Sequence, residues 1–413
     1  MDADLIVVGG GAAGFFAAIT AAGRGARVII LERGGQALAK VRISGGGRCN
    51  VTNACLDPAE LIMRYPRGGV ALRGPLTRFG PRETMGWFTT RGVVLKSEPD
   101  GRVFPRSDDA GEITGCLEEA AHRAGVQTRL RASVRAVTRA ETGFTVELSN
   151  GDKLSSARVL LATGGAAHGH ALAAALGHTI VPPVPSLFTF EVADTTLTAL
   201  SGLSVPAARV RLTAPGQGRE TGHEQTGPVL ITHWGLSGPA ILRLSAWAAR
   251  ALAEAGYRAE LTLAWLSRLS PEAIEEALTA RKRSAGAQHV VTQSPFGELP
   301  ARLWRRLVIK AGILEAQTWA KLPRDRARAL AAVLTGERLL ITGKGPFKEE
   351  FVTAGGVDLD EVDFRTMESK RCPGLFLAGE ILDIDGLTGG FNLQAAWTTG
   401  AIAGGLPRAP AQP

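Results

Sequence analysis

Three glycines follow the first apolar run of the chain with the spacing Gly9-x-Gly11-x-x-Gly14. Residues 5–8 form that apolar run, and a second run, 28–31, ends directly before Glu32. This order predicts a strand, a tight turn, a helix and a second strand that ends at an acid. A parallel βαβ unit of this kind opens dinucleotide-binding domains, so the pattern constrains the fold more than any other feature.

Each part of the pattern has a physical role. Gly9 permits the turn, Gly11 allows a pyrophosphate to approach the backbone, and Gly14 allows the helix to pack close to the strand. The helix N-terminus offers free N–H groups and the positive end of its dipole to phosphates. We expect Glu32 to accept a hydrogen bond from a ribose hydroxyl, because it lies at the end of the second strand. A carboxylate there repels a 2′-phosphate, so FAD or NAD fits this site and NADP does not.

The uncharged stretch 5–23 has two alternative interpretations, a membrane-spanning helix and a signal peptide. The glycine run 9–11 is a poor helix former, and the stretch is of marginal length for a span. Asp2 and Asp4 stand where a signal peptide needs positive charge. We therefore expect no membrane association and a cytoplasmic protein.

With 413 residues, of which 45% are hydrophobic, the chain has room for two or three domains. Its four cysteines contain no C-x-x-C pair, which argues against a disulfide scaffold or a zinc ribbon, and we expect no metal. The net charge of +8 raises the question of nucleic acid. The basic residues are scattered, however, and their clusters at 302–310 and 321–328 have helical spacing. We expect solvated helix faces and no nucleic-acid partner, although general attraction to anionic ligands stays open.

The pattern of elements predicts an α/β domain that an insert interrupts. Residues 1–185 and 346–413 form the first domain, and residues 186–345 form the insert, β-rich over 186–265 and helical over 266–335. Within the first domain we expect a helix over 110–125, strands over 126–137, 143–148 and 159–162, a helix over 171–176 and a helix over 393–404. The four residues Pro182-Pro183-Val184-Pro185 predict a stiff, extended connector.

Four motifs carry a resemblance that spans nearly the whole chain. They are VVGGGAAG at 7–14, ISGGGRCNVTN at 43–53, THWGLSGPAILRLS at 232–245 and the long run at 352–404. They resemble bacterial flavoproteins known as NAD(FAD)-utilising dehydrogenases, aminoacetone-oxidase-like FAD-binding enzymes and BaiN-like 3-dehydro-bile-acid reductases. The resemblance implies a glutathione-reductase-like FAD-binding Rossmann domain with a β-barrel-like and helical insert.

The motifs predict the cofactor contacts. The loop 44–48 can present successive N–H groups to a phosphate or to the flavin edge, with Arg48 as charge partner; the alternative is a surface loop that only needs positive φ. We expect Glu380 to accept a hydrogen bond from a ribityl hydroxyl, with Asp383 and Asp385 as alternatives. We also expect the helix that begins near Asn392 to point its N–H groups at the N1–C2 edge of the flavin. By resemblance, Val134 meets the adenine through its backbone. The full predicted set is Gly9, Gly11, Ala12, Ala13, Gly14, Glu32, Arg33, Lys40, Ser44, Gly46, Gly47, Arg48, Cys49, Asn50, Val134, Ala162, Thr163, Gly164, Gly379, Glu380, Asn392 and Leu393.

Two features limit what the resemblance implies. Five residues separate Cys49 from Cys55, whereas flavin-linked redox disulfides have four between them, so we favour Cys49 as a packed small residue over a disulfide reductase. The loop that follows Thr163-Gly164-Gly165 is shorter than in many relatives and runs through residues 166–170 almost directly into a helix. The loop near the pyrophosphate or the pocket mouth is therefore altered relative to these relatives, and this departure bears on the choice of substrate.

No second G-x-G-x-x-G unit follows a strand, so a dedicated nicotinamide domain is not expected. NAD(P)H would then visit the same pocket as the substrate and act as a transient donor. We favour an NAD(P)H-dependent flavin reductase of a small organic substrate such as a conjugated enone, which is what the resemblance to the bile-acid reductases implies. A flavin oxidase of a small amine that releases H2O2 and a non-catalytic flavin-binding protein stay open. No catalytic residue is assigned; His233 is a candidate proton donor, and a histidine packed in the core of the insert is the alternative. The sequence does not give the oligomeric state.

Overall fold

The structure, a computed structural model, describes residues 1–213, 223–345 and 352–405. The chain forms two compact units, Met1–Pro183 with Thr353–Pro413, and Val184–Val352. The sequence placed the boundaries at 185/186 and 345/346. The predicted second boundary and the predicted end of the first domain lie at 346–351 and 406–413, which are outside the described residues.

Unit 1 is built on a twisted sheet whose central strands are parallel. The strand order β18-β19-β20-β9-β1-β2-β6 places the first strand of the chain in the middle, where both faces of the sheet are covered and the strand is almost entirely buried. The strands are β1 (Ala3–Val8), β2 (Val28–Leu31), β6 (Gln127–Arg129), β9 (Lys153–Leu161), β18 (Val362–Asp363), β19 (Glu368–Ser369) and β20 (Leu375–Leu377). The edge strands β18 and β19 run antiparallel, as do β7 (Val134–Arg139) and β8 (Phe144–Leu148), which extend the sheet from β9.

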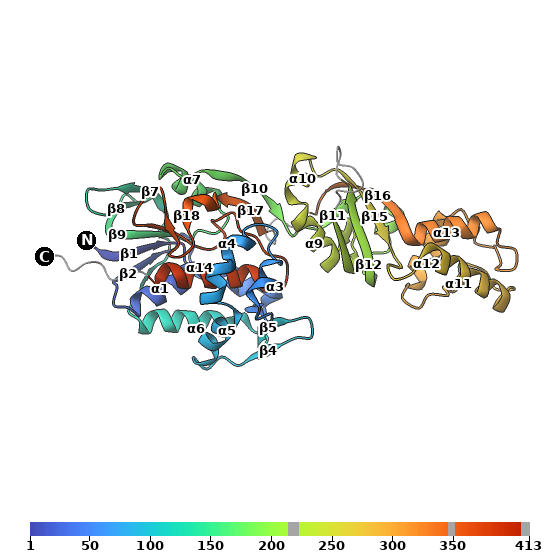
Figure 1. Cartoon of the computed structure of the whole chain (residues 1–413), viewed down its shortest axis with the longest axis horizontal. Helices are drawn as coiled ribbons and strands as arrows, with labels where there is room; N and C mark the ends of the chain where they lie inside the picture. The colour runs from blue at the N-terminus through green and yellow to red at the C-terminus, as the bar shows by residue number, and fades with distance from the viewer. Residues whose placement is uncertain (214–222, 346–351, 406–413) are drawn as a thin grey trace. The chain divides into compact units, whose positions relative to one another are not determined.

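Two helices with small residues, α1 (Ala12–Ala22) and α14 (Phe391–Gly404), lie side by side near the centre of unit 1 (Figure 1). A Cβ at Gly400 would lie 2.5 Å from the Ala13 carbonyl oxygen, and one at Gly404 would lie 2.3 Å from that of Ala17. Glycine at both positions therefore allows the two backbones to touch. This contact packs a helix from the beginning of unit 1 against a helix from its end.

The other elements of unit 1 surround this centre. The helices are α2 (Ala39–Ile43), α3 (Pro58–Ile62), α4 (Gly69–Arg78), α5 (Pro81–Thr89), α6 (Ala110–Arg123) and α7 (Ala167–Ala175). The 3-10 helices are η1 (Ser44–Gly47) and η3 (Leu359–Glu361). A small sheet consists of β3 (Thr52–Asn53), β4 (Leu95–Ser97) and β5 (Arg102–Pro105).

Unit 2 contains a closed antiparallel barrel, β11-β14-β13-β12-β15-β16, and a group of helices. Its strands are β11 (Phe190–Val192), β12 (Ser204–Thr213), β13 (Glu224–Ile231), β14 (Gly235–Ser237), β15 (Ala259–Ala264) and β16 (Glu337–Lys344). Its helices are α8 (Thr195–Thr198), α9 (Pro239–Trp247), α10 (Ala249–Glu254), α11 (Pro271–Ser284), α12 (Ala301–Lys310) and α13 (Arg324–Gly336). One continuous hydrophobic core joins the barrel and these helices and includes the buried indoles of Trp265, Trp304 and Trp319.

Several sequence predictions need correction. The segment 126–137 is two strands rather than one, because the chain turns at Arg131, which has a φ of 53°, and β6 and β7 join different neighbours. The helix expected over 171–176 begins at Ala167. The proline connector forms strand β10 (Ile180–Ser186), which pairs with β17 (Val352–Val357) in a two-stranded sheet. Proline has no N–H to donate, but its extended backbone is compatible with a strand at the edge of a sheet. The segment 186–265 also holds α9 and α10, which the sequence analysis did not predict.

The basic segment 302–310 is not simply a solvated helix face. Arg306 is only 7% exposed, and its guanidinium pairs with Asp194 at 2.6 Å and with Glu337 at 2.7 Å. Lys310 also reaches Glu337, at 2.6 Å. Helical periodicity could not show that this face meets the buried carboxylate of Glu337 and the partly exposed one of Asp194, which come from distant segments. The expectation of a solvated face is therefore wrong for Arg306.

Candidate functional site

The glycine turn between β1 and α1 leaves the open space that the sequence predicts for a pyrophosphate. A Cβ at Gly9 would lie 2.3 Å from the Ala162 carbonyl oxygen, and one at Gly14 would lie 2.0 Å from the Gly9 carbonyl oxygen. Both glycines are therefore required by packing. Gly11 differs, because its Cβ would meet no atom within 4 Å, and no side chain caps the helix that begins after it. The N–H groups of Ala12 and Ala13 in the first turn belong to this uncapped end, which favours an anion.

Glu32 lies beside this turn, at the end of β2. Its Oε2 accepts a hydrogen bond from the Gly10 N–H at 2.8 Å, and its Oε1 accepts one from the Gly34 N–H at 2.7 Å. These two bonds fix the carboxylate next to the glycine turn, and each oxygen keeps a lone pair that can accept a ribose hydroxyl. Arg33, the next residue, is exposed.

A second group of predicted residues gathers around the Glu380 carboxylate. Lys40 Nζ lies 3.1 Å from Glu380 Oε2, and Glu380 Oε1 accepts the Thr353 N–H at 3.0 Å. The position of a Cβ on Gly164 is 3.5 Å from Glu380 Oε2 and 3.6 Å from Lys40 Nζ. Lys40 follows β2, Gly164 follows β9 and Glu380 follows β20, so segments far apart in sequence meet at the carboxyl edge of the sheet. Open α/β sheets bind ligands at this edge.

The loop 44–47 presents backbone to open space. Gly45, Gly46 and Gly47 have φ of 59°, 69° and 84°, and a Cβ at Gly46 or Gly47 would meet nothing within 4 Å. Successive N–H groups in such a conformation can bind an anion or a carbonyl edge. Ser44 Oγ is held by the Val41 carbonyl oxygen at 2.7 Å.

Arg48 is already committed to protein carboxylates. Its guanidinium lies 2.9 Å from Glu98, 3.5 Å from Asp108 and 4.0 Å from the centre of the Phe104 ring. These contacts are all with protein groups, so the role of Arg48 as a charge partner of the cofactor stays a prediction.

Cys49 and Cys55 are both free thiols, as are Cys116 and Cys372, so the chain forms no disulfide. Cys49 is completely buried, and desolvation raises the pKa of its thiol to about 12. The neutral thiol is therefore the stable form, and Cys49 is a packed small residue. This arrangement does not fit a disulfide reductase.

The start of α14 is a further uncapped helix end. Gly390, with a φ of 88°, precedes it, and no side chain caps it. The Asn392 side chain makes two hydrogen bonds with the backbone of Gly386, at 2.8 Å each, and thereby orders the loop before the helix. The helix begins two residues before the predicted Leu393. The Asn50 amide is oriented with its oxygen toward Gly390, and this Oδ1 accepts the Gly390 N–H at 2.9 Å.

Asp385, an alternative to Glu380 in the sequence analysis, is fully buried and forms an ion pair with Arg67. Its carboxylate is committed to the protein interior, which leaves Glu380 as the better candidate. Sequence reasoning missed this pair and the Tyr65 hydroxyl, which donates to the Phe391 carbonyl oxygen at 2.8 Å. Neither Arg67 nor Tyr65 belongs to a recognisable motif, so only the folded structure reveals these two partners.

Other predicted residues have these positions. Ala162 N donates to the Val8 carbonyl oxygen at 2.9 Å, Gly379 N donates to Thr399 Oγ1 at 2.9 Å, and Val134 begins β7 with its carbonyl oxygen 2.5 Å from His168 Nε2. His233 lies in unit 2 and is exposed, so the alternative of a packed core histidine is wrong.

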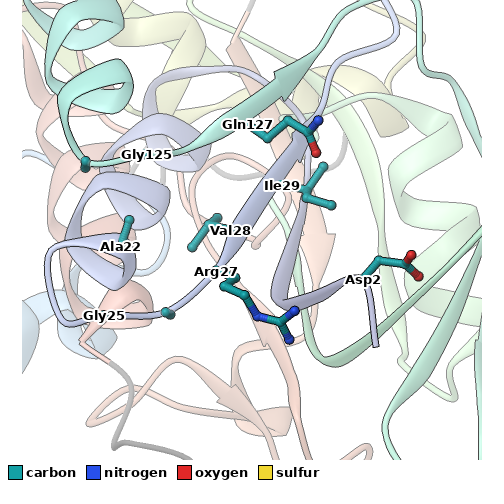
Figure 2. A pocket seen from close by; sticks show the side chains of 10 residues that line it. Asp2, Ala22, Gly25, Arg27, Val28, Ile29, Gly125 and Gln127 are labelled. Carbon is teal, nitrogen blue, oxygen red and sulfur yellow. The ribbon is translucent and has the colours of Figure 1, made fainter.

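One surface hollow of about 370 Å³ lies elsewhere, at the amino ends of the parallel strands (Figure 2). Asp2, Val28 and Gln127 are among the residues that line it. It shares no residue with the predicted cofactor set. Its rim includes Arg27, which pairs with Asp4 at 2.9 Å, so we interpret it as a structural groove. Within the described ranges, no helix is long and apolar enough to cross a membrane, and no group of three or more potential metal-binding side chains occurs.

Comparison with known proteins agrees with this geometry. Residues 3–406 match the family described as HI0933-like protein Rossmann domain. The chain is 32% identical over 411 residues to a protein of Clostridium scindens named 3-dehydro-bile acid delta(4,6)-reductase, covering 96% of this chain and 97% of that one. It is 30% identical over 407 residues to a protein of Escherichia coli named ribosomal RNA dihydrouridine synthase, covering 96% of each chain.

A solved structure supports the fold. The 3-ketosteroid-delta4-(5alpha)-dehydrogenase from Rhodococcus jostii, in complex with 4-androstene-3,17-dione, superposes with a TM-score of 0.52 at 18% identity, covering 97% of this chain and 96% of that one. The uncapped ends of α1 and α14, the open space at Gly11 and the fixed Glu32 carboxylate all fit FAD. The chain therefore belongs to the HI0933-like Rossmann family and is an FAD-dependent oxidoreductase.

Proposed function

We propose that this protein is a reductase that saturates a carbon–carbon double bond conjugated to a carbonyl group, with NAD(P)H as the electron donor. The observation that carries the proposal is the full-length likeness to two relatives whose names share this chemistry. One name specifies reduction of a 3-dehydro bile acid. The other specifies dihydrouridine, in which the double bond next to the uracil carbonyl is saturated.

The residues of this chain would bind and orient FAD in separate places. The first turn of α1, with Gly11, would receive the pyrophosphate, and Glu32 would accept a ribose hydroxyl. Glu380 would accept a ribityl hydroxyl. The uncapped start of α14 at Asn392 and Leu393 would face the flavin edge, where its N–H groups stabilise negative charge. The bound flavin supplies the hydride transfer, while the protein supplies position and field.

A single pocket would serve both donor and substrate in turn. Unit 2 is an antiparallel barrel with helices, rather than a second parallel βαβ fold of the kind that holds a nicotinamide. NAD(P)H would therefore bind, leave as NAD(P)⁺, and be followed by the substrate. His233 remains a candidate proton donor in this scheme, and the cytoplasmic location expected from the sequence is part of the proposal.

The substrate class that we favour is a small conjugated enone. A uridine in ribosomal RNA is the second candidate, and two observations favour it: the name of the Escherichia coli relative and the net charge of +8. This candidate differs from the sequence-based expectation that no nucleic acid is a partner.

Anaerobic half-reactions test the proposal. Purified holoenzyme is mixed with NADH or NADPH, and the loss of flavin absorbance is followed. The reduced enzyme is then mixed with a 3-keto-4-ene steroid, or with ribosomal RNA followed by nucleoside mass spectrometry. Rapid bleaching and reoxidation by either conjugated substrate support the proposal.

Other outcomes would replace it. Bleaching by aminoacetone, with peroxide formed on admission of air, would indicate the amine oxidase. No bleaching by any of these donors would indicate a flavin-binding protein without turnover. His233→Ala with unchanged reoxidation by substrate would remove His233 as the proton donor.

A further inference from the structure

The four consecutive residues 50–53 are each hydrogen-bonded to the start of α14 or to the loop before it. The Thr52 hydroxyl donates to Gln394 Oε1 at 2.5 Å, and both of these side chains are fully buried. The other three bonds join Asn50 Oδ1 to the Gly390 N–H at 2.9 Å, the Val51 carbonyl oxygen to the Trp397 indole N–H at 2.9 Å, and the Asn53 amide N–H to the Gly389 carbonyl oxygen at 3.0 Å. We call this set of four bonds the clamp.

Further bonds and close packing extend the clamp. Gln394 Nε2 donates to the Thr398 hydroxyl at 2.9 Å, and this hydroxyl donates to the Phe79 carbonyl oxygen at 2.8 Å. Both ends of the buried Gln394 amide are therefore bonded. A Cβ at Gly390 would lie 2.4 Å from the Thr52 carbonyl oxygen, so glycine at this position allows the two backbones to touch.

The segment 50–53 is itself held by a small sheet. Thr52 and Asn53 form β3, in which Thr52 lies opposite Val103 of β5, and the Val51 N–H donates to the Val103 carbonyl oxygen at 2.8 Å. The clamp thus ties the start of α14 to a base that has its own hydrogen bonds.

Filling of the interior does not require polar side chains here. Apolar side chains of the same shape would fill this space at little or no cost, because neither partner of a bond would then be left unsatisfied. Directional bonds do something that apolar packing does not, since a fully bonded buried network specifies a single arrangement of the segments that it joins. The clamp therefore fixes the position of the start of α14.

The backbone that the clamp fixes is the part of α14 that faces the flavin edge in the proposed site. Gln394 and Trp397 lie in the first two turns of the helix, next to the N–H groups that no side chain caps. Reduction of FAD by two electrons and one proton places negative charge at its N1–C2 edge, and preorganised N–H groups stabilise such charge. Exact placement of these groups therefore favours reduced FAD more than oxidised FAD.

We propose that Thr52 and Gln394 are positioning residues that raise the reduction potential of bound FAD by holding the start of α14 in place. They act through the backbone N–H groups that they align, rather than through contact with the cofactor. This inference rests on the proposed placement of FAD, with its flavin edge at the start of α14.

The reduction potential of the holoenzyme, measured against a reference dye during slow anaerobic reduction, tests this role. Thr52→Val and Gln394→Met keep the approximate shape of each side chain and remove its bond, whereas Thr52→Ser retains the hydroxyl. Ser156→Ala is the control for loss of a buried hydroxyl. Ser156 is fully buried, its hydroxyl donates to the Arg158 carbonyl oxygen at 2.8 Å, and it lies opposite Ala3 at the amino end of β1, away from the carboxyl edge of the sheet.

Thr52→Val and Gln394→Met should each lower the reduction potential by about 30 mV, which is a tenfold loss of affinity for reduced relative to oxidised FAD in a two-electron couple. The wild type, Thr52→Ser and Ser156→Ala should share one potential. Thermal unfolding of the FAD-free variants identifies any that do not fold, and either Thr52→Val or Gln394→Met suffices.

An unchanged or higher potential in a folded variant would overturn the role of the residue replaced. The role would also fall if Thr52→Ser matched Thr52→Val, or if Ser156→Ala lowered the potential equally, and in each of these cases the proposed function would stand. A wild type that binds no FAD would overturn the clamp's role and the proposed function together.

Discussion

Lys40 Nζ lies 3.1 Å from Glu380 Oε2, although 340 positions separate the two residues in the chain. The lysine side chain is 76% exposed and the glutamate side chain 24% exposed. An ion pair with this exposure contributes little to folding. Lys40 follows β2 and Glu380 follows β20, at the carboxyl edge of the sheet where we propose that FAD binds, so we propose a role for the pair in binding the cofactor.

Replacement of Lys40 by methionine should therefore separate stability from binding. We expect Lys40→Met to change the free energy of unfolding by less than about 1 kcal/mol, because solvent screens the pair. FAD affinity should fall about fivefold, as expected for the loss of about 1 kcal/mol of interaction. Urea unfolding and fluorescence titration with FAD provide the two values. Lys153→Met, at an exposed position of β9, is the matched control and should change neither; equal effects of both substitutions on FAD affinity would contradict the assignment.

Cys49 should be inert in the folded protein. Desolvation raises the pKa of its thiol to about 12, so almost no thiolate exists near neutral pH. We expect a thiol reagent to modify the partly exposed Cys55 and Cys116 long before Cys49, as measured by peptide mass spectrometry. Cys49→Ala should still be reduced by NAD(P)H. Fast labelling of Cys49, or loss of flavin reduction in a folded Cys49→Ala variant, would restore a redox role for this residue.

Arg306 should be a main determinant of the stability of unit 2. It is buried against Glu337, which is fully buried, and against Asp194. Arg306→Met leaves these carboxylates without their main partner, so we expect a loss of about 3–5 kcal/mol in thermal or urea unfolding. Arg305 lies on the same helix as Arg306 and forms an exposed pair with Glu315, so Arg305→Met should cost less than about 1 kcal/mol. Similar losses in the two variants would show that burial does not govern the effect.

The same cluster predicts sensitivity to acid. Its lysine and arginine partners, together with Thr196, hold the pKa of Asp194 well below its usual range in spite of the burial that opposes them. A carboxylate whose pKa is lowered on folding contributes stability above the pKa of the unfolded chain, and this stability is lost as the pH falls toward the pKa of the folded state. Asp194→Asn should flatten the decline in unfolding free energy below about pH 4. An unchanged acid limb in this variant would contradict the interpretation.

The sequence was most informative where local geometry and function coincide. The glycine spacing and Glu32 predicted the βαβ unit because the steric need for each glycine arises within one short segment of the chain. The split between β6 and β7 could not be predicted, because the turn at Arg131 interrupts an alternation that continues on both sides. The buried environment of Arg306 and the ion pair of Arg67 with Asp385 depend on contacts between distant segments. Periodicity shows which face of an element is apolar, but it does not show what that face meets.

The central claim is that the cofactor phosphates rest on the first turn of α1, and Gly11→Val tests it most directly. A side chain at Gly11 has open space, so this variant should fold with an unfolding temperature close to that of the FAD-free wild type. It should purify without flavin, because the side chain occupies the space of the pyrophosphate. Gly14→Ala, whose Cβ would lie 2.0 Å from the Gly9 carbonyl oxygen, should instead destabilise the fold itself. A folded Gly11→Val variant that retains a full complement of FAD, with the wild-type absorbance spectrum, would contradict the account.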